Sequence, residues 1–203
     1  MSTNHQELEA KFYINNLSAL KARLEALGAA LKHARVLEIN LRFDTPAGDF
    51  MQTFRALRLR QDAVARVTYK GPGTVQDGVR LRQELEFTVS DFDTAKAFLE
   101  ALGYQVVVIY EKYRTTYTLN ELEISLDEMP YGNFTEIEGP DGESIQEAAY
   151  RLGLDWEATI LDSYLVLFDR LRQTLGLSFR DLTFANFTGL TITPSTLDVQ
   201  TAM

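Results

Sequence analysis

The chain has no cysteine, two histidines and one tryptophan in 203 residues. The absence of cysteine excludes disulfide bonds, thiolate metal sites and a cysteine nucleophile, so metal ligands would have to be oxygen or histidine nitrogen atoms. No apolar run approaches the ~20 residues that span a bilayer. Residues 1–6 are polar and contain no signal-peptide core. We therefore expect a cytoplasmic protein with no membrane partner.

Basic residues are also in the minority, with 20 Lys and Arg against 29 Asp and Glu and a net charge of -9. Proteins that bind nucleic acids normally have a basic balance, so we expect no nucleic-acid partner. Net charge does not exclude a local anion site, because the potential inside a cleft depends on the residues that line it. The length is sufficient for a single domain with a substantial core.

What the sequence has in abundance is strand-like segments with an ionic or polar residue at every second position. Residues 7–11 read Glu-Leu-Glu-Ala-Lys, and similar alternation occurs in residues 56–60, 66–70, 80–87, 112–116, 121–127 and 136–138. Successive side chains of a strand point to opposite faces, so each segment has one charged face and one mostly apolar face. A solvated face would carry a mixture of Ser, Thr, Lys and Gln. Dense clusters of Arg and Glu instead predict a polar cavity.

The same alternation, with the turn signals between segments, predicts the elements. Strands are expected at 7–13, 36–43, 56–61, 64–70, 79–89, 104–119, 122–129 and 134–138, and helices at 17–31, 92–102, 144–152 and 156–175. Residues 71–73 and 76–78 are expected to form the loop between two strands. The predicted fold is α+β and mainly antiparallel β, a closed or nearly closed barrel with helices covering its apolar exterior. Residues 1–175 would form one domain, and residues 176–203 a tail that is partly packed or disordered.

The charged faces carry both signs in quantity. The basic set is Lys11, Arg58, Arg60, Arg66, Lys70, Arg80, Arg82, Lys112 and Arg114, and the acidic set is Glu7, Glu9, Glu84, Glu86, Glu123, Asp127, Glu136 and Glu138. Burying so many charges without a ligand would cost several kcal/mol per ion, roughly. Arginine and lysine suit a polyanion with several phosphoryl groups. The carboxylates would repel it unless a hard divalent cation bridged them, so the pattern predicts a triphosphate bound with Mg²⁺ or Mn²⁺.

Three members of these sets have more than one interpretation. Arg66 and Arg80 have the right parity but lie toward strand ends, so the sequence leaves rim, surface and ligand-contact positions open. Glu123 is assigned a structural or ion-pairing role.

These segments also carry a resemblance to a known family. The pentapeptide with Glu7, Glu9 and Lys11 is similar to the ExExK signature of the CYTH family, the triphosphate tunnel metalloenzymes. Further elements that resemble the family, in the family's order, are residues 43–46, 57–60, 68–72, 82–86, 112–114, 126–127 and 132–138. The resemblance covers residues 5–170. The family includes class IV adenylyl cyclases, thiamine triphosphatases and inorganic triphosphatases.

The resemblance implies an eight-stranded antiparallel tunnel with separate triphosphate-binding, metal-binding and catalytic residues. The triphosphate would be held by Lys11, Arg58, Arg60, Lys70, Arg82, Lys112 and Arg114, and one or two Mg²⁺ or Mn²⁺ ions by Glu7, Glu9, Glu84, Glu86, Asp127, Glu136 and Glu138. Lys11, Arg58, Lys112 and Glu136 would be the catalytic residues. Members of the family form dimers, so a homodimer is a further expectation.

Three functions are compatible with this set. The first is hydrolysis of a nucleoside, organic or inorganic triphosphate with release of phosphate. The second is a class IV adenylyl cyclase, in which the ribose 3′-hydroxyl attacks the α-phosphorus of ATP and pyrophosphate leaves. The third is a non-catalytic polyphosphate or nucleotide sensor, which loss of the carboxylates would have favoured. Both charged sets are present, so we expect an enzyme.

Overall fold

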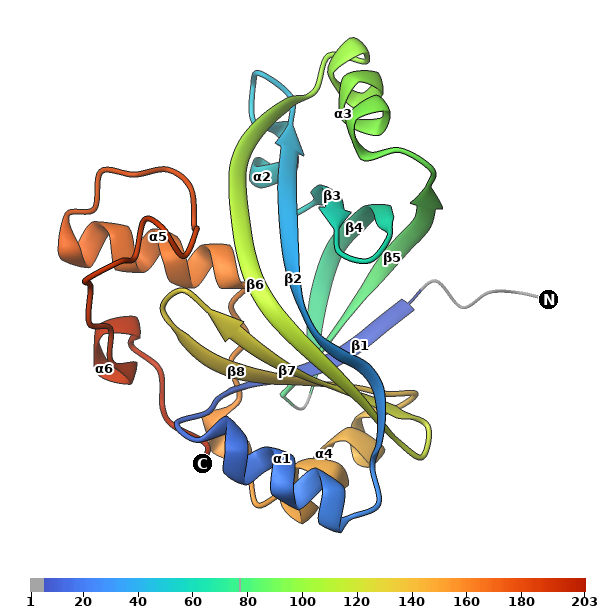
Figure 1. Ribbon diagram of the computed structural model, residues 1–203, viewed down its shortest axis with the longest axis vertical. Coiled ribbons are helices and arrows are strands. Elements are labelled where there is room, and N and C mark those ends of the chain that lie inside the picture. Colours follow the sequence, from blue (N-terminus) through green and yellow to red (C-terminus); the bar gives the residue numbers. More distant parts are fainter. Residues whose placement is uncertain (1–5, 77) are drawn as a thin grey trace.

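The computed structural model describes residues 6–76 and 78–203, and its centre is a closed barrel (Figure 1). The ring order is β1-β5-β4-β3-β2-β6-β7-β8, and all neighbouring strands are antiparallel. The strands are β1 (Gln6–Tyr13), β2 (Ala30–Asp44), β3 (Ala56–Gln61), β4 (Ala65–Gln76), β5 (Val79–Val89), β6 (Gln105–Leu119), β7 (Leu122–Met129) and β8 (Gly132–Glu138). The predicted fold class is confirmed.

Helices cover the apolar outer faces of the strands. They are α1 (Leu17–Ala26), α2 (Asp49–Gln52), α3 (Phe92–Ala101), α4 (Gly142–Arg151), α5 (Tyr164–Leu175), α6 (Pro194–Leu197) and the 3-10 turn η1 (Trp156–Ala158). One cluster joins the outer face of β1 to α1 and α4 through Phe12, Leu20 and Ile145, and another joins β3 to α3 through Leu59 and Leu99. Because the apolar face of each strand packs outward, the charged face points into the barrel.

The first helix is shorter than the sequence predicts. Leucines at helical spacing predict a helix over 17–31, but α1 ends at Ala26, and residues from Ala30 onward belong to β2. Gly28 follows with φ of 81°, a left-handed conformation that glycine adopts at little cost and that terminates helices. The last leucine of the series, Leu31, is exposed on the strand.

The helix predicted over 156–175 is also wrong in its first half. The 3-10 turn η1 is followed by an extended stretch in which the Ile160 N–H donates to the Lys11 carbonyl oxygen at 2.8 Å. The helix α5 begins only after Ser163, whose hydroxyl accepts a hydrogen bond from the Val166 N–H at its first turn. This later start places Tyr164 at the barrel interior.

The predicted loop at residues 71–73 belongs to β4. That strand continues through both glycines to Gln76, and the register with β5 shifts between Lys70 and Gly73. Such a bulge lets a strand absorb irregular residues without ending. The second part of the expected loop includes Asp77, which lies outside the described residues, as do residues 1–5.

The C-terminal segment, residues 176–203, packs against the barrel wall. Leu182, Phe187 and Leu197 are buried in an aromatic cluster with Tyr131 and Phe168. Leu182 forms a bridge to Tyr110 of β6, and Thr201 forms one to Tyr13 of β1. In Figure 1 this segment lies beside α5 on the outside of the barrel. No helix in the described part of the chain has the length and hydropathy to cross a membrane.

Candidate functional site

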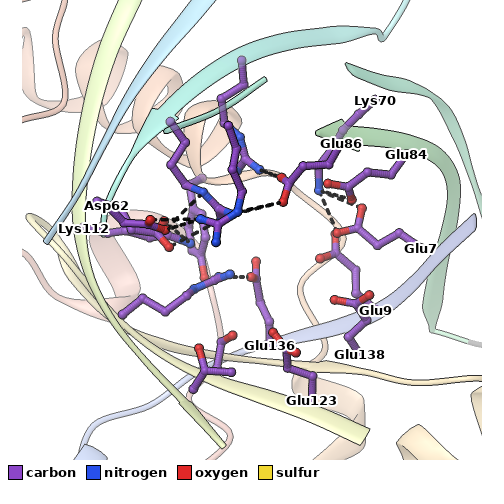
Figure 2. A pocket seen from close by; sticks show the side chains of 18 of the residues that line it. Glu7, Glu9, Asp62, Lys70, Glu84, Glu86, Lys112, Glu123, Glu136 and Glu138 are labelled. Carbon is purple, nitrogen blue, oxygen red and sulfur yellow. Dashed lines mark hydrogen bonds and ion pairs between the residues drawn. The ribbon is translucent and has the colours of Figure 1, made fainter. Parts of the chain in front are cut away.

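The lumen of the barrel is a cavity of about 780 Å³ lined mainly by charged side chains (Figure 2). Thirteen of the residues predicted for the site line it: Glu7, Glu9, Lys11, Arg58, Arg60, Lys70, Arg82, Glu84, Glu86, Lys112, Arg114, Glu136 and Glu138. Arg66, Arg80 and Glu123, for which the sequence left other positions open or preferred, line it as well. The alternation of the strands therefore identifies the wall of this cavity.

Glu7 lies at the centre of a dense ion-pair network between β1, β4 and β5. Its two oxygens lie 2.7 Å from Lys70 Nζ and 2.9 Å from Arg82 Nε, and Lys70 Nζ lies 2.9 Å from Glu84 Oε2. Burial alone would raise the pKa of Glu7, but the charges of Lys70 and Arg82 outweigh it and lower the pKa far below its ordinary value. The two cations therefore favour the ionised form of Glu7.

Asp127 is the register partner of Arg114 and is not among the residues that line the cavity, because its neighbours cover it. It is fully buried, and its oxygens accept hydrogen bonds from Arg114 Nε at 2.6 Å, Lys112 Nζ at 3.0 Å and the Tyr164 hydroxyl at 2.8 Å. The sequence predicted a metal ligand here. These charge-assisted hydrogen bonds connect Asp127 to Lys112 and Arg114, and its role as a metal ligand stays a prediction.

Glu86 belongs to the arginine-rich part of the lumen. Its carboxylate lies 3.4 Å from Arg58 Nη2, 3.3 Å from Arg60 Nη2 and 3.6 Å from Arg66 Nε. Of the two β5 carboxylates predicted as metal ligands, Glu84 is therefore the one that lies near the β1 carboxylates.

A row of carboxylates crosses three neighbouring strands. Glu9 of β1 is the register partner of Glu138 of β8, and Glu138 is the register partner of Glu123 of β7. Like charges directly opposite one another destabilise a sheet. Burial raises the pKa of Glu138, and the charges of Glu7, Glu123 and Glu84 add to the effect, so that the pKa reaches about 7. Glu9 is paired with Arg82 and Glu123 with Lys32, whereas Glu138 forms no ion pair within the described residues.

The chemistry of this row fits a divalent cation. In the described part of the chain no three His, Asp or Glu side chains already converge as a closed metal cage. Glu9, Glu138 and the neighbouring Glu84 instead present hard oxygen donors around the lumen, and burial followed by the charge of Glu7 raises the pKa of Glu84. Mg²⁺ prefers such an open set, because it completes its shell with water and phosphate oxygens.

Sequence reasoning missed several lumen residues. Glu38 and Arg42 of β2 line the cavity, and Glu38 lies 3.5 Å from Arg60 Nη1 and 3.6 Å from Lys112 Nζ. Residues 36–43 alternate like the other strands, so the signal for these two was present. Tyr164 could not be found this way, because it reaches the lumen from the start of a helix.

The fold and the lumen together define a class of protein, a closed antiparallel β-barrel whose interior is lined by both acidic and basic side chains. A family model described as "CYTH domain" matches residues 5–155. A Methanocaldococcus jannaschii protein named "Putative adenylate cyclase" is 30% identical over 134 residues, 65% of this chain and 75% of the relative. The chain belongs to the CYTH domain family.

Solved structures share the architecture. A Vibrio parahaemolyticus protein described as a "putative adenylate cyclase" has a TM-score of 0.73 and 21% identity, covering 80% of this chain and 97% of its own. A Pyrococcus horikoshii protein has a TM-score of 0.67 and 27% identity, covering 79% and 98%. A Hippeastrum adenylyl cyclase homologue described as having "a dominant triphophatase activity" has a TM-score of 0.62 and 22% identity, covering 80% and 95%.

Proposed function

We propose that this protein is a metal-dependent enzyme that binds a triphosphate inside the barrel and hydrolyses it, releasing orthophosphate. The observation that carries the proposal is the mixed charge of the lumen lining. Arg58, Arg60, Lys112 and Arg114 enter the lumen from β3 and β6, and Glu9 and Glu138 enter it from the paired strands β1 and β8. A triphosphate bridged to one or two Mg²⁺ or Mn²⁺ ions would contact both the cations and the carboxylates.

In the proposed reaction the oxygen of a water molecule attacks the terminal phosphorus. The bond from that phosphorus to the bridging oxygen breaks, orthophosphate and diphosphate are released, and one proton leaves to solvent. Lys11, Arg58 and Lys112 would hold the phosphoryl oxygens and stabilise the negative charge of the transition state. Glu136 lies 3.4 Å from Lys11 Nζ and also contacts Arg114, and would orient both cations. A bound divalent ion would supply further charge neutralisation and lower the pKa of a coordinated water.

The aromatic lining favours a substrate recognised through its phosphates. The tyrosines of the lumen are Tyr110 and Tyr164 within the described residues. The Tyr164 ring is covered by Lys11 Nζ at 4.4 Å and Lys112 Nζ at 5.4 Å, and the Tyr110 hydroxyl faces Arg58. Cations of the phosphate-binding set therefore contact the Tyr164 ring and the Tyr110 hydroxyl.

Adenylyl cyclase activity is the second candidate. The Methanocaldococcus jannaschii relative, named as a cyclase, supports it. The cavity of about 780 Å³ also falls within the range of pockets that take ligands of nucleotide size. In this reaction the ribose 3′-hydroxyl would attack the α-phosphorus, with pyrophosphate as leaving group.

Product analysis separates these candidates. The protein is incubated with Mg²⁺ or Mn²⁺ and, in parallel, with tripolyphosphate, thiamine triphosphate or ATP, and the products are chromatographed. Orthophosphate is the expected product. Cyclic AMP with pyrophosphate would replace the hydrolase proposal by the cyclase. Ligand-induced thermal stabilisation with no turnover of any substrate would replace both by a sensor.

A further inference from the structure

Arg42 is an arginine of the lumen whose charge has no partner among the described residues. It lines the cavity from β2, and its Nε atom is buried without a hydrogen-bond partner. The Nε atoms of Arg58 and Arg60 are also buried without a partner, but Arg58, Arg60, Arg66, Arg82 and Arg114 each contact at least one carboxylate. Arg80, which has no carboxylate partner in the described residues, donates to the Leu161 carbonyl oxygen at 3.5 Å. An unsatisfied buried donor is costly, and on a charged group more so. Arg42 therefore differs from the arginines that the free protein already neutralises.

The residue opposite Arg42 on the neighbouring strand β3 adds to the positive charge around it. Arg42 and Arg58 are direct register partners between β2 and β3, so two guanidinium groups enter the lumen side by side. Arg58 Nη2 reaches Glu86 at 3.4 Å and Thr68 Oγ1 at 3.1 Å. Burial lowers the pKa of Arg42, and the charges of Arg58 and Arg82 add to the effect. Arg58 thus shares Glu86 with Arg60 and Arg66, whereas Arg42 forms no ion pair within the described residues.

The positive charges of this wall also affect the pKa of the neighbouring Tyr110 hydroxyl. The Tyr110 hydroxyl lies 3.5 Å from Arg58 Nη1. Burial alone would raise the pKa of Tyr110, but the charges of Arg58, Lys112 and Arg42 outweigh it, and the net shift is downward. The pKa values of Arg42 and Tyr110 are both lowered by the charge of Arg58, and an anion at this wall would offset that charge.

The ring order sets this wall apart from the acidic strands. Between β2 and β1 lie three strands in either direction around the barrel, so Arg42 on β2 faces the lumen from the side opposite Glu7 and Glu9 on β1. An anion held by Arg42 would lie across the lumen from those carboxylates. Its binding would depend on arginine and not on a bridging metal ion.

We propose that Arg42 and Arg58 together form a phosphoryl-binding site on the β2-β3 wall, which holds one phosphate group of the substrate through charge-assisted hydrogen bonds without a metal ion. Two planar guanidinium forks side by side match the several oxygens of a phosphoryl group. This deepens the proposed function and rests on it, because the ligand is the same triphosphate.

The test is metal-free binding of tripolyphosphate, measured by titration calorimetry in excess EDTA. The proteins are wild type, Arg42→Gln, Arg42→Lys and the control Arg151→Gln, which removes an exposed arginine of α4. Arg42→Gln is expected to weaken binding roughly 10- to 100-fold, and Arg42→Lys less, because lysine keeps the charge but loses the fork. Arg151→Gln is expected to bind like wild type.

Thermal unfolding without ligand separates binding from a structural role. Because Arg42→Gln removes an unneutralised buried cation, the unliganded variant is expected to melt at the wild-type temperature or above it. A lower melting temperature together with weaker binding would overturn the proposal, since Arg42 would then support the fold. Binding that Arg42→Gln leaves unchanged would overturn the Arg42 site alone. If wild type binds no tripolyphosphate with or without Mg²⁺, the proposed function fails as well.

Discussion

Lys70 Nζ lies 2.7 Å from Glu7 Oε1, so a side chain expected to bind phosphate is paired with one expected to bind metal. Glu84 shares the same lysine at 2.9 Å. In the free protein the two halves of the proposed site therefore neutralise one another. Binding of a metal-bound triphosphate would exchange these internal pairs for contacts to the ligand, which limits the net electrostatic gain.

Replacing Lys70 by methionine tests this exchange. In EDTA the free energy of unfolding of Lys70→Met should fall by roughly 2–3 kcal/mol, because Glu7 and Glu84 lose the cation that they share. Mg²⁺ should then raise the melting temperature more in the variant than in wild type. Lys96→Met, which removes an exposed lysine paired with Glu100, is the control. An identical Mg²⁺ effect in Lys70→Met and wild type would exclude Glu7 and Glu84 as metal ligands.

Glu9 is the carboxylate best suited to test the metal site by activity. Glu9 lies 3.4 Å from Arg82 Nη2, and Arg82 also forms an ion pair with Glu7. Because Arg82 keeps this second partner, Glu9→Gln should remain folded. We expect kcat to fall at least roughly 100-fold, with activity partly restored at high Mg²⁺ or Mn²⁺ concentration. Phosphate release is measured against metal concentration, with exposed Glu121→Gln as the control. Full activity of Glu9→Gln at low metal concentration contradicts the assignment.

Glu38 should contribute to the pH dependence of stability. Burial alone would raise its pKa, but the charges of Lys112, Arg114 and Arg60 lower it to about 2, below the ordinary value of 4.5. A depressed carboxyl pKa stabilises the folded state above pH 4.5, and this contribution is lost as pH falls toward 2. Glu38→Gln should therefore be less stable than wild type by roughly 2–3 kcal/mol at pH 7.

Denaturant titrations of wild type and Glu38→Gln between pH 2 and pH 7 measure this difference. The gap between the two proteins should narrow as pH falls through the window from 4.5 to 2. A difference in stability that stays constant across that window would show that the carboxylate charge of Glu38 contributes nothing.

Tyr164 joins α5 to the lumen through a single hydroxyl group. It donates to Asp127 Oδ2 at 2.8 Å in a buried setting. Tyr164→Phe should lower the free energy of unfolding by about 2 kcal/mol, because a buried carboxylate loses a donor. Urea denaturation measures the loss, and Tyr150→Phe, which removes an exposed hydroxyl of α4, should be neutral. If the two variants are equally stable, the hydrogen bond from Tyr164 does not support Asp127.

Much of the fold and of the site could be predicted from the alternation of the strands. In residues 56–60 and 79–89 the parity of each side chain fixed which face it occupies, and the bounds of β3 and β5 agree with the prediction. The end of α1 and the start of α5 were harder to predict, because the spacing of apolar residues continues past Gly28 and across Ser163. There a left-handed glycine and an N-cap outweighed the periodicity.

The sequence by itself determined which side chains share a face, because a strand has only two faces and their charges differ. It therefore determined the chemistry of the lumen, with Arg58 and Lys112 among its cations and Glu9 among its carboxylates. Only the closed barrel decided which of these charges meet. Ring order and register are set by packing between strands distant in sequence, and they placed Glu138 between two other carboxylates and Arg42 beside Arg58.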